Sequence, residues 1–302
     1  MYTLMTNDVE EVSIVNNNLN SVIAKKVSNV GIPRLINIYS KYDVSATFYF
    51  TGTFANTYPE SVHNVLDHGH EVGCHGYSHS PHHYFDKLSV KQQLTHLSKA
   101  KEKIESIAGK IEAFRAPALR IGDHTPQILE KLGFKTDSSV APMRFDGPLT
   151  SGGLRKLNWL TCPRDPYYMS LKNPYKRGAS SVLEIPVSSY FAGYQGTTMR
   201  IAPKLNNLVE NKLYSDSRKN RRPIVFLFHP TELVTEVRVA KSLRRSKSYM
   251  GYLFSDLIRQ KLKLQNIGKK SLPLLENVLK KAKKESHQFV SAREFRLNFK
   301  KC

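Results

Sequence analysis

Hydrophobic and polar positions alternate between strand-like and helix-like patterns along the first 140 residues. Short runs rich in β-branched and aromatic residues, which are typical of strands, occur at 2–5, 44–50, 71–75 and 111–114. Segments with apolar residues at helical spacing lie between them and begin at Pro33, Pro59, Ser89 and Thr125. This alternation with short connections predicts βαβ units and a parallel sheet or barrel.

The rhythm breaks at residues 141–180, where Gly and Pro cluster around the single tryptophan, Trp159. We expect a long loop excursion over one end of the domain. Strand patterns return at 182–187 and 224–228, and the second is apolar throughout, as in a strand buried on both faces. We therefore interpret residues 1–302 as a single α/β domain, with its core at about 2–295 and a basic, partly helical region at 236–285.

The chain is strongly basic, with 46 Lys and Arg against 25 Asp and Glu and a net charge of +21. Residues 236–302 alone hold 18 basic and 5 acidic residues, a net +13. Basic residues such as Arg244, Arg245 and Lys247 precede an aromatic patch, which suits peripheral contact with anionic membrane lipids. The alternative, slightly favoured, is a pair of basic helices that face water. We expect no nucleic-acid partner.

Three other features bear on location. The three cysteines cannot form a disulfide framework, and their odd number hints at a reducing compartment. No apolar run approaches the roughly 18 residues of a membrane helix, and the N-terminus lacks the layout of a signal peptide. We expect a cytoplasmic protein, membrane-peripheral at most. The sequence leaves the oligomeric state open.

Titratable side chains follow the predicted strands at their carboxyl ends. In a parallel α/β barrel these ends meet on one face, so the side chains should share one cavity. Along the chain they are Asp8 and Glu10, His75 and His79, Arg115, Asp137, and His229.

The spacing of His75 and His79 indicates a metal site. On one helical turn, two imidazoles four residues apart lie on the same face, within reach of one cation. Asp8 or Glu10 could supply a carboxylate as the third ligand. Zinc is the expected ion, and cobalt or manganese would also suit this ligand set. Cys74 is expected to be a small core residue, because strand neighbours point to opposite faces.

Five short motifs, in this order, resemble those of the polysaccharide deacetylase family, the NodB-homology domain of carbohydrate esterase family 4. They are Thr6–Glu10, His75–His79, Phe114–Pro117, Asp137–Ser139 with Trp159, and Phe226–Pro230. The first motif takes an Asp-x-Glu form, with Val9 where the usual paired Asp places its metal carboxylate. The resemblance implies a single TIM-like (β/α) barrel, incomplete at seven strands.

The resemblance also implies a role for each residue. Asp8 would be the general base, Arg115 would orient it, and His229 would be the general acid. Asp137 would hold His229 and raise its basicity. Glu10, His75 and His79 would bind the metal, and Trp159 would bind substrate. The roles of Asp8 and Glu10 could be exchanged.

The implied activity is that of a metal-dependent hydrolase acting on non-peptide carbon–nitrogen bonds. It would remove an N-acyl group, usually acetyl, from an amino-sugar compound, such as a soluble or lipid-linked intracellular intermediate. One alternative is a hydrolase of non-sugar amides, imides or ureides on the same barrel, because a fold does not define a substrate. Another is a catalytically inactive basic binding protein.

Overall fold

The computed structural model describes residues 1–302 except 16–17, 146–153, 237–258 and 300–302. Its strands are β1 (Tyr2–Val9), β2 (Ala46–Phe50), β3 (Glu71–Cys74), β4 (Ala113–Phe114), β5 (Thr136–Asp137), β6 (Tyr167–Ser170), β7 (Asn173–Arg177), β8 (Leu183–Glu184), β9 (Ser189–Tyr190), β10 (Ala192–Gly193), β11 (Ile224–Phe228) and β12 (Gln288–Phe289). Its helices are α1 (Ser21–Lys26), α2 (Ile32–Lys41), α3 (Gly52–Thr57), α4 (Pro59–Asp67), α5 (Val90–Ala108), α6 (Thr125–Lys131), α7 (Gly196–Ile201), α8 (Pro203–Asn220), α10 (Arg259–Lys263), α11 (Ser271–Lys284) and α12 (Ala292–Asn298).

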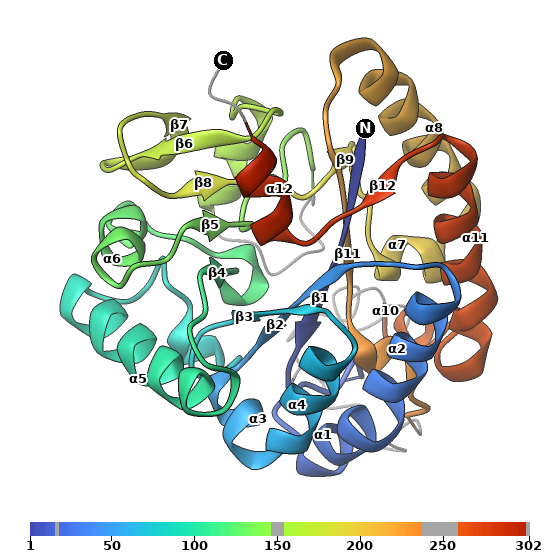
Figure 1. Cartoon of the computed structure of the whole chain (residues 1–302), viewed down its shortest axis with the longest axis horizontal. Helices are drawn as coiled ribbons and strands as arrows, with labels where there is room; N and C mark the ends of the chain where they lie inside the picture. The colour runs from blue at the N-terminus through green and yellow to red at the C-terminus, as the bar shows by residue number, and fades with distance from the viewer. Residues whose placement is uncertain (16–17, 146–153, 237–258, 300–302) are drawn as a thin grey trace, which may run out of the picture.

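A curled sheet forms the centre of the molecule, with helices around its outer side (Figure 1). β1 pairs in parallel with β11 and β2, and parallel pairing continues through β3, β4 and β5 to β8. Residues between β8 and β11 join the two ends of this run, since Ser188 N donates to Val225 O at 3.0 Å. The predicted α/β fold is thus confirmed, while the seven-stranded form of the barrel stays a prediction.

The helices that cover the sheet begin and end where the sequence predicts. A capping box of Ser89 and Gln92 starts α5, and Gly109, at φ 71°, ends it. Pro59 occupies the first turn of α4. α2 buries Leu35 and Ile36 against the sheet, as the helical spacing of its apolar residues predicts.

The helix α12 covers the end of the curled sheet at which β1 begins (Figure 1). The ring of Phe295 lies 5.9 Å from that of Tyr2, and Ala292 N donates to Thr47 Oγ1 at 2.8 Å. These contacts close the amino ends of the strands. The carboxyl ends, at the opposite face, are left to carry the polar groups.

In the second half of the chain, the structure corrects the expected loop at 141–180 and leaves the expected membrane contact untested. Residues 141–180 are not all loop, because β6 and β7 form an antiparallel hairpin whose β6 extends the sheet beside β8. Alternate residues Tyr167 and Met169 are buried, which explains the strand. In the basic region, α10 and α11 are helical. Arg244, Arg245 and Lys247, on which the predicted membrane contact depends, lie outside the described residues.

Trp159 is a core residue and not the substrate contact expected from the sequence. Its side chain is only 1% exposed. It packs in the cluster of apolar side chains enclosed by the curled sheet, together with Val140, Leu183 and Leu227. Burial of a large aromatic ring is strongly favourable, and here a Gly- and Pro-rich segment supplies that ring.

We expect Trp159→Ala to lower the free energy of unfolding by about 3–5 kcal/mol, because truncation leaves a cavity that its neighbours cannot fill. Chemical denaturation followed by circular dichroism measures this. Trp159→Phe, which keeps an aromatic ring, should lose less. An unchanged denaturation midpoint for the alanine variant would show that Trp159 is not a core residue and would favour the substrate contact.

Candidate active site

The first strand supplies two carboxylates to the interior. Successive residues of a strand point to opposite faces, so Asp8 and Glu10 share a face and Val9 points to the other. Val9 accordingly packs in the outer core, between sheet and helices. Asp8 and Glu10 are both buried, at 3% and 7% exposure. The strand period therefore explains why a carboxylate two residues after Asp8 can reach the same site.

Glu10 lies beside both histidines of the predicted metal motif. Its Oε2 is 3.5 Å from His75 Nε2 and 3.1 Å from His79 Nε2. Among the described residues, these three form the one group of at least three His, Cys, Asp or Glu residues whose ligand atoms all lie within 4.8 Å of one another. Glu10 Oε2 and His75 Nε2 are buried without a hydrogen-bond partner. A divalent cation would give both atoms a partner, so the residues fit a metal centre.

A second contact prepares His75 as a ligand. Its Nδ1 hydrogen bonds to the backbone carbonyl of Arg115 at 2.9 Å. A carbonyl can only accept, so Nδ1 carries the proton and Nε2 keeps its lone pair toward Glu10. Cys74, next to His75, is fully buried in the outer core, as expected.

A loop, not a helical turn, brings the two imidazoles together. Gly76 has φ 73°, in the left-handed region that favours glycine, and a Cβ there would lie 3.1 Å from Pro117 Cγ. The ring centroids of His75 and His79 are 5.6 Å apart. The expected proximity is therefore present, but the expected helical conformation is wrong.

Arg115 is held in place on every side. Its Nη1 donates to Asp8 Oδ1 at 2.9 Å, and its Nε and Nη2 donate to the carbonyl and hydroxyl of Ser138, each at 2.7 Å. The guanidinium carbon lies 4.5 Å from the ring centroid of Tyr49. With its side chain 0% exposed, the cation is fully paired and stacked, as a buried arginine requires. Asp8 is thereby fixed with Oδ2 left over.

His229 faces the same cavity from the end of β11. Its Nε2 is 3.9 Å from Asp8 Oδ2, and its Nδ1 is 3.2 Å from Glu232 Oε1. Glu232 is held in turn by Arg200, whose Nε donates to it. A Cβ on Gly196 would lie 2.5 Å from Glu232 Oε1, so only glycine leaves room for this carboxylate. A cavity of about 120 Å³ adjoins Glu10, His229 and Glu232.

The structure thus corrects the expected partner of His229. Asp137 accepts a hydrogen bond from Ser139 and lies beside Glu184 in the interior, while Glu232 holds His229. An acidic residue three positions after the histidine was the signal in the sequence that could have identified Glu232. Nothing in the local sequence indicates Arg200 or Glu184, which come from distant segments.

The charges of the site set the protonation states. Burial raises the pKa of Asp8, but Arg115, His75 and His229 outweigh it and the net pKa is lowered. Burial likewise opposes ionisation of Glu10, yet the neighbouring histidines lower its pKa to about 2. Burial depresses the pKa of His229, but its hydrogen bond to Glu232 and the charges of Glu10 and Asp8 raise it to about 9. At neutral pH both carboxylates are ionised and His229 is protonated.

Asp137 and Glu184 form a second buried carboxyl pair. Burial raises the pKa of Asp137 to about 6, partly offset by the hydrogen bond from Ser139. Burial and the charge of Asp137 raise the pKa of Glu184 well above its usual value. Two adjacent buried carboxyl groups cannot easily carry two negative charges, so the pair retains a proton near neutral pH.

Comparison with known proteins identifies related sequences for part of the chain. Residues 26–136 match the family model described as polysaccharide deacetylase. The peptidoglycan deacetylase of Helicobacter pylori is 38% identical over 113 residues, covering 37% of this chain and 37% of that protein. Peptidoglycan deacetylase-like protein FGM2 of Gibberella zeae is 33% identical over 115 residues, covering 37% and 33%. The matched stretch spans only about a third of either relative.

Solved structures resemble nearly the whole chain. A Mycobacterium smegmatis protein described as a polysaccharide deacetylase superposes with TM-score 0.65 at 17% identity, covering 98% of this chain and 89% of that one. PuuE allantoinase superposes with TM-score 0.61 at 14% identity and the same coverage. At these identities the likeness shows the fold. Together the matches confirm the resemblance inferred from the motifs.

We expect Glu10→Gln and His75→Ala each to lose bound divalent metal while the fold survives, because the first removes the charge of the carboxylate ligand and the second removes an imidazole ligand. Elemental analysis of the purified protein, with circular dichroism as the check on folding, measures this. His63→Ala, an exposed histidine outside the cluster, is the control. Full metal occupancy in both variants would contradict the assignment.

The buried carboxyl pair predicts a pH effect on stability. A carboxyl whose pKa is raised in the folded state keeps its proton where the unfolded chain has lost it. The free energy of unfolding therefore falls as pH rises above about 4 and keeps falling through neutral pH while the pair retains its proton, by up to about 1.4 kcal/mol per pH unit for one retained proton. Glu184→Gln, which imitates the protonated state, should gain stability relative to the natural chain as pH rises from 5 to 8.

Urea denaturation at several pH values measures this difference, with Glu102→Gln on the exposed side of α5 as the control. A stability difference between Glu184→Gln and the natural chain that stays constant over this range would show that the pair does not retain a proton.

Proposed function

We propose that this chain, which carries the sequence motifs and the fold of polysaccharide deacetylases, is a metal-dependent hydrolase that removes an N-acetyl group from an amino-sugar compound. The observation that carries the proposal is the convergence of two functional pairs beside one metal centre. Asp8 with Arg115 forms the first pair, and His229 with Glu232 forms the second. Both face Glu10, His75 and His79 from the carboxyl ends of different strands.

The roles follow from which atoms are already engaged. Asp8 uses Oδ1 for Arg115, so Oδ2 is free to accept a proton from a water molecule in the cavity. Glu10 faces both imidazoles, which favours Glu10 as the metal ligand and Asp8 as the base. A divalent metal held by Glu10, His75 and His79 would polarise the acyl carbonyl and favour ionisation of the attacking water.

His229 supplies the proton for the leaving amine. An amine leaves as a neutral group only if it is protonated as the carbon–nitrogen bond breaks. Glu232 holds Nδ1 and directs Nε2 toward Asp8, and a pKa of about 9 keeps the imidazole protonated at neutral pH. The side chain of His229 is 27% exposed and that of Asp8 is 5% exposed, so of the proposed acid and the proposed base a substrate reaches His229 more easily.

The substrate class rests on the names of the relatives, two of which are a peptidoglycan deacetylase and a peptidoglycan deacetylase-like protein. We infer an N-acetylated amino sugar as substrate, with a soluble or lipid-linked intracellular intermediate as the specific form. No helix among the described residues is long and apolar enough to cross a bilayer. We propose zinc as the working ion, and cobalt or manganese would also suit this ligand set.

The test is turnover of a panel of substrates by the zinc-loaded protein, followed as acetate released from the N-acetylated sugars and as ring opening of the non-sugar substrates. The panel should contain N-acetylglucosamine oligomers, peptidoglycan fragments, nucleotide sugars and lipid-linked sugars, with allantoin and cyclic imides as non-sugar substrates. Acetate from any amino sugar supports the proposal. Turnover of the ureide or imide alone would favour the non-sugar carbon–nitrogen hydrolase. No turnover of any substrate by metal-loaded protein would favour a binding protein.

We expect Asp8→Asn to keep the metal and lower kcat by about 10²- to 10⁴-fold, because a positioned base contributes about that much. Steady-state acetate release and elemental analysis together measure this. Glu11→Gln, which changes a carboxylate three residues further along the chain that bonds to Thr51, is a matched control. Loss of the metal in Asp8→Asn would instead indicate that Asp8 is the metal ligand and Glu10 the base.

A further inference from the structure

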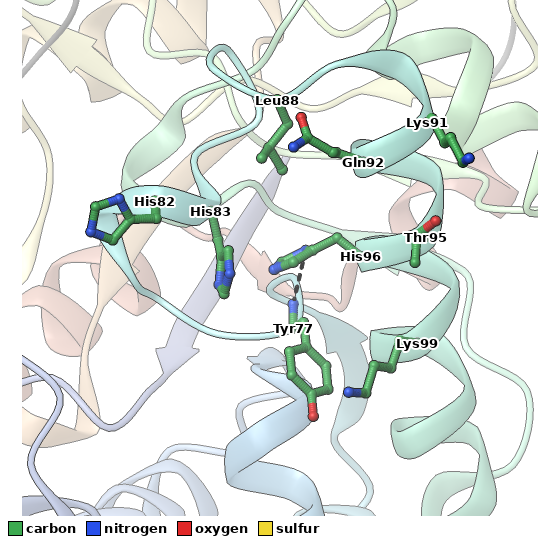
Figure 2. Close-up of a pocket in the computed structure, with 9 residues that line it drawn as sticks. All are labelled: Tyr77, His82, His83, Leu88, Lys91, Gln92, Thr95, His96 and Lys99. Atoms are coloured by element: carbon green, nitrogen blue, oxygen red, sulfur yellow. Dashed lines mark hydrogen bonds between the residues drawn. The ribbon is translucent and has the colours of Figure 1, made fainter.

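Two long helices on the outer side of the sheet, α5 and α8, differ in what they present to solvent (Figure 1). α5 has the composition of a helix that faces water. Its outer side carries Lys91 and Lys99 beside an open hollow of about 610 Å³ (Figure 2), and the exposed Glu102 lies one turn further on. This hollow shares no lining residue with the cavity beside Glu10 and His229. α8 presents a different pattern.

The outer face of α8 carries leucines among lysines. Leu205 and Leu208 are 42% and 66% exposed, and Lys212 is exposed one turn after Leu208. These positions are spaced by three and four residues, so they share one face of the helix. The buried positions, Asn206, Val209, Glu210, Leu213, Tyr214 and Ser217, form the opposite face. The outer leucines therefore contribute nothing to the core of this chain.

The same face of α8 is positively charged without acidic neighbours on the helix. Lys204, Lys212 and Lys219 are all exposed. The helix has only two acidic residues. Glu210 is buried and accepts a hydrogen bond from Tyr194, and Asp216 pairs with arginines at both 164 and 222. No carboxylate of α8 is thus left to balance the exposed lysines.

A tight hairpin beside α8 presents an aromatic ring at its tip. Tyr190 of β9 pairs with Ala192 of β10, so Phe191 is the single residue between the two strands. Phe191 has φ 63°, in the left-handed region, and is 66% exposed. A bulky side chain is rarely found at positive φ, and this ring has no core to fill in return. A strained residue that is retained without a packing role indicates a functional one.

Ring contacts join the helix face and the hairpin tip into one surface. The ammonium of Lys212 lies 5.7 Å from the ring centroid of Tyr190. The rings of Tyr190 and Phe191 are in turn 4.7 Å apart, at an interplanar angle of 81°. We call these residues, with Leu205 and Leu208, the α8–hairpin surface. It combines protruding apolar side chains with cations.

Lysine within an apolar surface favours a bilayer over other partners. The core of a protein interface is depleted in lysine. Leucine and phenylalanine side chains have no hydrogen-bonding group for the hydroxyls of a glycan. At a bilayer, apolar side chains enter the boundary between headgroups and acyl chains, while lysine stems lie along them and keep their ammonium groups among the headgroups. Anionic headgroups also suit a chain of net charge +21.

We propose that the α8–hairpin surface docks the protein on a bilayer that contains anionic phospholipids. Leu205, Leu208 and Phe191 enter the bilayer boundary, and Lys212 contacts the lipid phosphates. The first half of α8 follows α7, which begins at Gly196 beside the carboxylate that holds the proposed acid. Docking through this face therefore holds the candidate site close to the lipid surface.

The test is co-sedimentation of the full chain with vesicles of phosphatidylcholine, with and without phosphatidylglycerol, at low and at high salt. The natural chain should bind the anionic vesicles more tightly than the neutral ones, and less tightly at high salt, because salt screens the attraction. Leu208→Ser and Phe191→Asn should each lower the partition coefficient about fivefold to tenfold. Leu297→Ser, which removes a side chain on α12 that is 67% exposed, is the matched control and should bind as the natural chain does.

Phe191→Asn also separates docking from folding. Asparagine adopts positive φ more readily than phenylalanine does, so this variant should unfold at the same or a higher urea concentration than the natural chain. Loss of vesicle binding together with unchanged or increased stability is the expected result. A lower urea midpoint would show that Phe191 serves packing, and would remove it from the docking surface.

Fluorescence gives a second readout. The added emission of Phe191→Trp, relative to that of the natural chain, should move to shorter wavelength with anionic vesicles, because the ring leaves water. No binding of the natural chain at low salt, or an equal loss in Leu297→Ser, would overturn the proposal. Binding that falls in Lys212→Gln but not in Leu208→Ser or Phe191→Asn would reduce the effect to general attraction and overturn it as well.

A second copy of the chain is the rival occupant of this surface. Sedimentation equilibrium without vesicles tests it, because a dimer that Leu208→Ser and Phe191→Asn convert to monomer would assign the surface to self-association and overturn docking on lipid. The inference does not depend on the proposed activity. Vesicle binding without turnover of any substrate would leave the docking surface in place, and turnover without vesicle binding would leave the hydrolase.

Discussion

The buried ion pair of Arg115 and Asp8 is the interaction on which the site depends. Removing a guanidinium and a carboxylate from water costs several kcal/mol per ion, and good geometry with further hydrogen bonds has to offset that cost. Here Ser138 satisfies the remaining donors and Tyr49 stacks on the cation. The same residue also fixes the metal motif, since its backbone carbonyl sets the tautomer of His75. One arginine therefore positions the proposed base and one proposed ligand together.

The two histidines have different partners at Nδ1. The Nδ1 of His75 bonds to the backbone carbonyl of Arg115, which leaves Nε2 toward Glu10, while the Nδ1 of His229 faces the carboxylate of Glu232, which favours the protonated ring. Glu232 can serve His229 only because Arg200 neutralises it and Gly196 leaves it space. The Nη1 of Arg200 also donates to the carbonyls of Lys263 and Gln265, so part of the basic region supports the proposed acid.

The sequence predicted the parts of the fold that local patterns control. Strand–helix alternation, the capping box of α5 and the apolar run of β11 identified most of the parallel sheet, and the carboxyl ends of its strands identified Asp8, Glu10, His75 and His229. Long-range packing controls what was missed. Trp159 is buried by residues distant in sequence, and the hairpin of β6 and β7 depends on pairing with β8. The conformation of the His75–His79 loop depends on the φ of Gly76, which spacing alone does not reveal.

The error over Asp137 has a physical cause. Asp137 is committed to a buried carboxyl pair with Glu184, in which one proton is retained, and its Oδ1 accepts the hydrogen bond of Ser139. Its hydrogen bond to Ser139 serves the scaffold instead. Ser139 Oγ accepts from Ala116 N at 2.8 Å, directly after Arg115, while Val140 N donates to Glu184 at 3.0 Å. The carboxyl pair thus fixes the backbone on which Arg115 is mounted, and it can do so with one proton retained. A fully charged Glu232, neutralised by Arg200, is the better partner for a histidine that must stay protonated.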